Sequence, residues 1–419
     1  MTKFIHTADL HIDSPLRGLA VRDEAMMRRV QRATRTALER IVDLAIEQQV
    51  AFVLIAGDLF DGDWKDMHSG QWVAGQFRRL ADADIGVYYI RGNHDAVSQI
   101  QRKIRWPENV VELPHDKPIT IALEDIGIAI HGQGFADREV MIDLAAKYPQ
   151  RVNGMFNVGM LHTSLTGSEH HDTYAPTTIE TLRSRGYDYW ALGHIHLRNA
   201  EPLSTEPYVT YSGNPQGRHI REPGAKGCLL AELEGESLKQ VTFHPTDSLR
   251  WQELVLDVSQ ETSLEGVLAQ ARTAIQAGHD QHQGLGSAFR LTFCGATKVH
   301  QQLSDLIKRN EVLLEIHNAA EAIDDEIWIE RVRIDTRPQS QVSLQNTHDL
   351  WGSISQQFDR VQADADAIKQ LETLVKPVLD KVSAQHISLS DEGTLDERLP
   401  EWITAAEELL RSRLGAKSE

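Results

Sequence analysis

Five short clusters of polar residues in the first half of the chain carry the side chains best suited to chemistry. They are Asp9-Leu10-His11, Gly57-Asp58, Gly92-Asn93-His94-Asp95, His162 and Gly193-His194-Ile195-His196. Taken singly, such pairs are ordinary surface residues or turns. Two divalent metals about 3.5–4 Å apart, however, require this combination: a bridging carboxylate, imidazoles on both ions and a neutral oxygen donor. The ordered set therefore predicts a two-metal site, with the glycines expected to let the backbone turn sharply.

Each cluster stands at the end of an apolar run that is typical of a strand. The runs are "KFIHTADLH", "VAFVLIAGD", "GVYYIRGNHD", "FNVGMLHTS" and "YDYWALGHIH", and "IGIAIHGQGF" is a further one. The segment "VQRATRTALERIVDLAIEQQ" has apolar residues at helical spacing. Alternating strands and helices predict a layered α/β fold, in which ligands bind at the carboxyl ends of the strands. The polar clusters occupy those ends.

The length of 419 residues predicts two or three domains. We expect a first domain at residues 1–248, whose last part, from about 205 to 245, is β-rich. Residues 249–337 read as a β-α-β-α-β series, and residues 338–419 carry long helical patterns. In that last region Leu350, Ile354, Phe358, Val361 and Ile368 form one apolar stripe, which either packs on the rest of the chain or docks a partner helix.

Composition narrows the classes of function. The formal net charge of −18 argues against broad, nonspecific adhesion to nucleic acid or anionic lipid. It leaves a DNA substrate open, because carboxylates that hold cations count as negative here and a local basic groove can coexist with an acidic whole. No apolar run reaches 18 residues, so no membrane span is expected. With only two cysteines, a disulfide framework is not expected, and the cytoplasm is the simplest location.

The ligand types also bear on the metal and the nucleophile. Histidine with carboxylate oxygen suits manganese, with iron or zinc as alternatives, better than magnesium. The chain has no motif for a nucleophilic serine or cysteine. We therefore expect hydrolysis by a water that two metals activate for attack on phosphorus.

The pattern D-x-H, G-D, G-N-H-D, H and G-H-x-H resembles that of the calcineurin-like metallophosphoesterase superfamily over roughly residues 1–235. The resemblance implies a four-layer α/β/β/α sandwich with a small α+β capping domain, to which the helical patterns add a helical C-terminal region. It implies that Asp9, His11 and His196 hold the first metal, that Asp58 bridges, and that Asn93, His162 and His194 hold the second. His94 would then lie beside the scissile phosphate, with Asp95 orienting it from behind.

Within the superfamily, "FIHTADLHIDSPL" and "AGDLFD" are similar to the DNA repair exonuclease branch of SbcD-like chains. Those chains read D-x-H-L-G, whereas Ile12 and Asp13 follow His11 here, which favours the YhaO-type members. The resemblance implies a metal-dependent DNA nuclease, expected to be a manganese exonuclease, that acts with an SMC-like coiled-coil ATPase and is compatible with a homodimer. Two alternatives stay open: a phosphatase or phosphodiesterase acting on a small molecule or phosphoprotein, and a non-catalytic DNA-binding subunit.

Further polar residues near the clusters receive separate predictions. Arg218, in "YSGNPQGRHIREPG", is the preferred phosphate contact. Asp13 and Asp61 are interpreted as turn or supporting residues rather than metal ligands. His6, inside the first strand, is interpreted as a core residue whose hydrogen bonds are satisfied.

Overall fold

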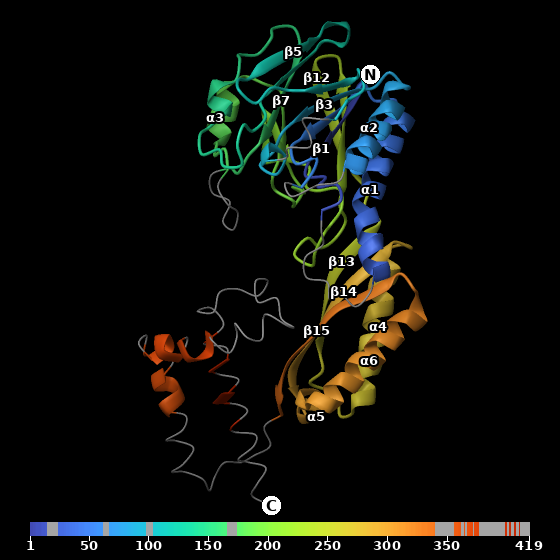
Figure 1. Cartoon of the computed structure of the whole chain (residues 1–419), viewed down its shortest axis with the longest axis vertical. Coiled ribbons are helices and arrows are strands. Elements are labelled where there is room, and N and C mark those ends of the chain that lie inside the picture. Colours follow the sequence, from blue (N-terminus) through green and yellow to red (C-terminus); the bar gives the residue numbers. More distant parts are fainter. Residues whose placement is uncertain are drawn as a thin grey trace, which may run out of the picture. The chain divides into compact units, whose positions relative to one another are not determined.

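A computed structural model of the chain (Figure 1) describes residues 1–14, 24–61, 67–97, 104–165 and 174–339, together with parts of 356–410. The chain divides into two compact units. The first comprises residues 1–253, 278–289 and 326–328, and the second comprises residues 254–277, 290–325 and 329–419.

The first unit contains two six-stranded sheets. The strands of the first sheet are β1 (Thr2–Thr7), β2 (Phe52–Ala56), β3 (Gly86–Ile90), β4 (Val110–Glu112), β11 (Gly227–Glu234) and β12 (Ser237–Pro245). Their order is β12-β11-β1-β2-β3-β4. The strands β1 to β4 run parallel, whereas β11 pairs antiparallel with both β1 and β12.

The strands of the second sheet are β5 (Ile119–Leu123), β6 (Ile128–Gly132), β7 (Phe156–His162), β8 (Tyr189–Gly193), β9 (Ser204–Thr205) and β10 (Tyr208–Tyr211). Their order is β5-β6-β7-β8-β10-β9, with β6, β7, β8 and β10 parallel. The edge strands β5 and β9 are antiparallel to their neighbours. Short 3-10 helices lie at η1 (Asp95–Val97), η3 (Glu124–Ile126) and η4 (Ala145–Lys147).

The two sheets pack face to face around an apolar core. The strand β2 is buried at every position, as expected of a strand that is covered on both faces. In this core Phe4 and Leu54 of the first sheet lie in one cluster with Ile130 and Val158 of the second.

Helices cover the outer faces. The helices α1 (Glu24–Glu47) and α2 (Met67–Ala81) lie along the first sheet (Figure 1), with Ile41 and Phe77 packed in its outer cluster. The helix α3 (Ile179–Ser184) contributes Leu182 to the cluster that covers the second sheet around Trp190. The predicted α/β/β/α layering is confirmed.

His6 ties the two sheets together. It is fully buried in β1, and its ring nitrogens lie 3.0 Å from the Tyr189 hydroxyl and 3.1 Å from the Leu192 carbonyl oxygen, both in β8. Burial lowers the pKa of His6 to about 3, so the ring is neutral at ordinary pH. The interpretation of His6 as a satisfied core residue is confirmed.

The chain after residue 248 adds a three-stranded sheet in the order β13-β14-β15. Its elements are β13 (Leu249–Asp257), α4 (Leu264–Gln281), β14 (Gly286–Thr297), α5 (His300–Ser304), α6 (Leu306–Ile323) and β15 (Ile327–Pro338). The second helix of the predicted β-α-β-α-β series is divided into α5 and α6. Asp305 leaves helical geometry, and its side chain caps α6 by accepting hydrogen bonds from the Ile307 and Lys308 backbone N–H groups.

The C-terminal region contains helical segments at 356–361, 367–371 and 373–376, as expected. Of the predicted apolar stripe, Phe358, Val361 and Ile368 are half-buried, and Leu350 and Ile354 lie outside the described residues. A search of the described helices finds none long and apolar enough to cross a membrane.

Candidate metal centre

All seven predicted metal ligands lie in the first unit, at or just beyond the carboxyl ends of parallel strands. In the first sheet Asp9 and His11 follow β1, Asp58 follows β2 and Asn93 follows β3, and in the second sheet His162 ends β7 and His194 and His196 follow β8. These strands are neighbours within their sheets, so the two sheets bring their loops to one edge.

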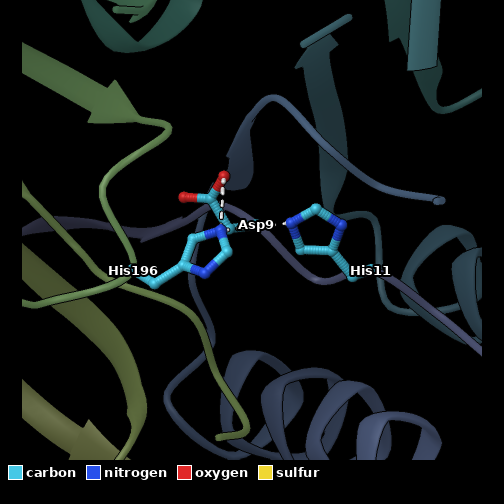
Figure 2. Close-up of side chains that lie close together, drawn as sticks. All are labelled: Asp9, His11 and His196. Carbon is cyan, nitrogen blue, oxygen red and sulfur yellow. Dashed lines mark hydrogen bonds and ion pairs between the residues drawn. The ribbon is translucent and has the colours of Figure 1, made fainter. Parts of the chain in front are cut away.

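Three of these ligands, Asp9, His11 and His196, converge on one point (Figure 2). The Nε2 atoms of His11 and His196 are 3.3 Å apart, and His196 Nε2 lies 3.9 Å from Asp9 Oδ1. Asp9 and His11 are buried, whereas the His196 side chain is 25% exposed. The group is therefore accessible from the side of His196.

His162 and Asn93 form a second group with Asp58. His162 Nε2 lies 2.9 Å from Asn93 Oδ1 and 3.5 Å from Asp58 Oδ2, and the ring of His194 is centred 5.2 Å from that of His162. The same Asp58 Oδ2 atom lies 3.7 Å from His11 Nε2 in the first group. One carboxylate oxygen thus faces both groups, which is the position that a bridging ligand requires.

The backbone at the ligands is unusual. Asp9, His11, Asp58 and His194 have φ values of 54°, 43°, 53° and 97°. Residues with side chains rarely adopt this left-handed region, which costs about 1–3 kcal/mol per residue and recurs at functional sites. The sharp turns thus occur at the ligands themselves.

The neighbouring glycines serve close packing. A Cβ atom on Gly193 would lie 1.9 Å from the Ala56 carbonyl oxygen, and one on Gly92 would lie 2.2 Å from Asp58 Oδ1. Of the three glycines that directly precede the predicted ligands Asp58, Asn93 and His194, Gly57 alone combines a left-handed turn, with φ of 101°, and a close approach, here to His162. The expectation that the glycines make the turns is therefore corrected at Gly92 and Gly193, where glycine is needed for space.

The surroundings of His162 fit a bound cation. Its Nδ1 lies 2.9 Å from the Ala56 carbonyl oxygen, which can only accept, so Nδ1 carries a hydrogen. In a neutral ring Nε2 would then point a lone pair at the oxygens of Asn93 and Asp58. Burial acts to lower the pKa of His162, but the Asp58 carboxylate outweighs it and raises the pKa to about 9. A proton relieves the repulsion, and a divalent metal at Nε2 would do the same.

Glu222 is a buried partner of the centre that the sequence analysis missed. Its Oε1 lies 2.6 Å from His196 Nδ1, and its Oε2 accepts hydrogen bonds from the Arg218 backbone N–H and from Asn214 Nδ2. Burial acts to raise the pKa of Glu222, but the His196 contact outweighs it and holds the pKa well below its usual range. The carboxylate keeps the hydrogen of His196 on Nδ1 and leaves Nε2 for a metal.

His94 lies at the exposed edge of the centre, with 31% of its side chain exposed. Its Nδ1 lies 2.6 Å from Asp61 Oδ1, and Ser14 Oγ donates a hydrogen bond to Asp61 Oδ2. Burial acts to lower the pKa of His94, but the hydrogen bond with Asp61 outweighs it and raises the pKa. Asp61 thus fixes the ring of His94, in agreement with its interpretation as a supporting residue.

Asp95 binds the backbone of two loops of the centre. Its carboxylate accepts hydrogen bonds from the backbone N–H groups of Leu59, Phe60 and Gly92. Asp95 therefore joins the loop after β2 to the loop after β3, which carry Asp58 and Asn93. A carboxylate that accepts several N–H groups stabilises these loops, and the orientation of His94 by Asp95 stays a prediction.

Arg218 lies beside the first group. Its Nη2 is 3.3 Å from His196 Nδ1 and 3.5 Å from Glu222 Oε1, and its Nη1 donates a hydrogen bond to Ser14 Oγ. Its side chain is 14% exposed. The guanidinium group is thus near the centre, and its contact with a phosphate stays a prediction.

Asp13 lies one layer further out. It forms a bidentate ion pair with Arg35 of α1, in which Nε lies 2.7 Å from Oδ1 and Nη2 lies 2.6 Å from Oδ2. It also accepts a hydrogen bond from Ser69 of α2. These contacts hold the loop after β1 against both helices.

This fold and donor set define a calcineurin-like metallophosphoesterase, and the chain belongs to that family. Residues 2–198 match the family model of the calcineurin-like phosphoesterases, and residues 251–337 match that of the middle domain of metallophosphoesterase YhaO. The chain is 32% identical over 375 residues to the uncharacterized metallophosphoesterase YhaO of Bacillus subtilis, an alignment that covers 88% of this chain and 90% of that protein.

More distant relatives are named DNA double-strand break repair protein Mre11. The Methanopyrus kandleri protein is 24% identical over 272 residues, which cover 58% of this chain and 56% of that protein. The Sulfolobus acidocaldarius protein is 21% identical over 291 residues, which cover 65% of this chain and 72% of that protein. Membership of the family implies a hydrolase of phosphoesters with a dimetal centre.

Proposed function

We propose that the protein is a metal-dependent DNA nuclease that hydrolyses phosphodiester bonds at this centre. The observation that carries the proposal is the convergence of the seven predicted ligand side chains beside the half-exposed His94. DNA as the substrate is supported by the similarity to proteins named DNA double-strand break repair protein Mre11. Cleavage from a strand end is the expected mode of action.

The proposal assigns the two ions to the two groups. Asp9, His11 and His196 would hold one ion, Asn93, His162 and His194 would hold the other, and Asp58 would bridge them. Bound ions would lower the pKa of a water toward neutrality and offset the charge that develops on the phosphate. Imidazole, carboxylate and amide ligands favour manganese, with iron or zinc as alternatives.

The side chains around the ions would complete the reaction. His94, which Asp61 orients, can donate a proton to the oxygen that leaves phosphorus. Arg218 can hold a phosphate oxygen through its guanidinium group. Glu222 and Asp95 do not reach the substrate in this scheme, and they keep the ligands in place.

We further propose an SMC-like coiled-coil ATPase as the partner and allow for a homodimer, on the basis of the resemblance to SbcD-like nucleases. Co-purification of the full chain with such an ATPase from the same genome tests this part. Deleting residues 340–419 then decides whether the C-terminal region is the docking surface, and unchanged capture of the ATPase would exclude that role.

The proposal is tested by cleavage of end-labelled single- and double-stranded DNA with added Mn²⁺. The native chain is compared with Asp58→Asn and His94→Gln, and all three are also assayed with bis(p-nitrophenyl) phosphate and p-nitrophenyl phosphate. We expect DNA and diester cleavage that both substitutions abolish. Turnover of the monoester alone would replace the nuclease by a phosphatase, and metal-loaded protein that binds DNA but cuts no substrate would favour a DNA-binding subunit.

A further inference from the structure

A pocket of about 570 Å³ lies apart from the metal centre, and every residue that lines it belongs to the first compact unit. One wall is the face of α1 that carries Arg32, Thr36 and Arg40. The rest of the lining includes Gly284–Gly286, Trp328 and the start of β13. The volume is within the range of about 300–1,000 Å³ that ligand sites occupy.

The pocket carries more positive than negative side chains. Arg32 and Arg40 lie on one face of α1, because residues four and eight apart align along a helix. The guanidinium of Arg40 donates to the backbone carbonyl oxygens of Thr246 and Asp247. Within the described part of the chain, neither Arg32 nor Arg40 forms an ion pair with a carboxylate.

Other arginines nearby are paired. Arg35, on the same helix, binds Asp13, and Arg250 binds Asp247 at 2.8 Å. The pocket itself contains one carboxylate, that of Glu326, against two guanidinium groups. Its net charge is therefore positive although the whole chain carries −18, so the pocket attracts an anion locally.

The pocket also has an aromatic lining residue, Trp328. Trp328 is partly buried and packs against the cluster of Leu249, Trp251 and Ala288 while it lines the pocket. A Cβ atom on Gly286 would lie 2.9 Å from the Trp328 ring, so glycine there lets the turn lie close to the indole. An indole beside two guanidinium groups is the combination that binds a base by stacking and its phosphate by charge.

We propose that this pocket binds a nucleotide, with the phosphate at Arg32 and Arg40 and the base at Trp328. The expected ligand is one nucleotide of a DNA strand that extends beyond the metal centre. This choice of ligand rests on the proposed function. A free nucleotide offers the same chemistry, so the experiment includes both.

The test measures DNA binding of the full chain in EDTA, where cleavage does not occur. Fluorescence anisotropy with a labelled single-stranded oligonucleotide gives Kd over a range of KCl concentrations, and calorimetry with dAMP tests the free nucleotide. Arg32→Ala is the main variant, because Arg32 is exposed and its removal leaves the packing intact. Arg79→Ala, on α2, removes an equal charge outside the pocket and is the matched control.

We expect Arg32→Ala to lower the slope of log Kd against log salt by about one and to weaken binding on the order of tenfold at 0.1 M salt. Arg79→Ala should match the native chain. If Arg32→Ala loses dAMP binding but keeps the DNA binding of the native chain, the pocket binds a free nucleotide. If Arg32→Ala and Arg79→Ala behave alike with both probes, the inference is wrong.

Different results would contradict the proposed function and the pocket proposal. A native chain that neither binds nor cuts DNA contradicts the nuclease proposal, and the dAMP titration with Arg32→Ala then decides the inference by itself. A native chain that cuts DNA while Arg32→Ala keeps the native salt slope and dAMP binding contradicts the pocket alone.

Discussion

Replacing Glu222 by glutamine should weaken metal binding although no predicted metal ligand is replaced. The two carboxylate oxygens of Glu222 receive three hydrogen bonds, from His196 Nδ1, Asn214 Nδ2 and the Arg218 backbone N–H. An amide has one oxygen and one NH₂ group, so in either orientation the NH₂ group would face a donor. The side chain is 5% exposed, and water cannot repair the loss.

The size of the effect follows from these contacts. A lost hydrogen bond to a buried charged group costs about 1.5–3 kcal/mol, and tenfold in an equilibrium constant corresponds to about 1.4 kcal/mol. We therefore expect the Kd for one of two Mn²⁺ ions to rise about 10–100-fold, the range that is typical for carboxylates behind metal-binding histidines. Calorimetric titration of metal-stripped protein with Mn²⁺ measures both affinities.

Glu330→Gln is the matched control, because the Glu330 side chain is likewise only 3% exposed and its carboxylate also binds an arginine, Arg290. It should retain native Mn²⁺ binding. The thermal unfolding temperature in EDTA shows whether Glu222→Gln folds. A folded Glu222→Gln protein that binds both ions with native affinity would refute the role assigned to this carboxylate.

Three further predictions concern the fold and the centre. Asp61→Asn should lower kcat for a diester about 10–100-fold while the Mn²⁺ content stays native, because it affects the ring of His94; loss of metal would contradict this. His6 has a folded pKa of about 3 against 6.5 when unfolded, so the unfolded chain takes up a proton first as the pH falls. Between pH 6.5 and 4 the native free energy of unfolding in EDTA should fall more steeply than that of His6→Gln, by up to about 1.4 kcal/mol per pH unit; equal slopes in urea titrations would rule this out. Gly193→Ala should destabilise the fold by about 1–3 kcal/mol, since its Cβ would meet the Ala56 carbonyl; an unchanged melting temperature would argue against the tight contact.

The central strands could be predicted from the sequence because parallel strands covered on both faces read as continuous apolar runs. The runs before Asp9, Asp58 and His162 are of this kind, and they became β1, β2 and β7. The same runs also predicted where the ligands lie, since each run is followed by polar residues at the carboxyl end of its strand.

The edge elements had no such signal. The strand β4 has only three residues, all half-buried, and β9 has only two residues, so both strands are too short to show alternation. The helix α2 has no counterpart among the predicted elements, and the break between α5 and α6 depends on the side-chain cap at Asp305, which a helical periodicity conceals.

The supporting carboxylates were the hardest part of the centre to predict. Glu222 contacts His196 across 26 positions of the chain, and no local pattern marks it. Asp95 and Asp61 are both acidic residues near His94 in sequence or in space, and only the hydrogen bonds separate an anchor of the loops from a partner of the ring. Contacts made by tertiary folding leave no periodicity in the sequence.

The central claim is that the seven ligands hold two ions with Asp58 between them, and metal stoichiometry tests it most directly. Metal-stripped protein is dialysed against Mn²⁺, the metal per chain is measured by mass spectrometry, and electron paramagnetic resonance reports whether the ions are coupled. We predict two coupled Mn²⁺ ions per native chain and loss of the coupling in Asp58→Asn. A single ion, or two ions whose spectrum does not change in Asp58→Asn, would contradict the bridged centre.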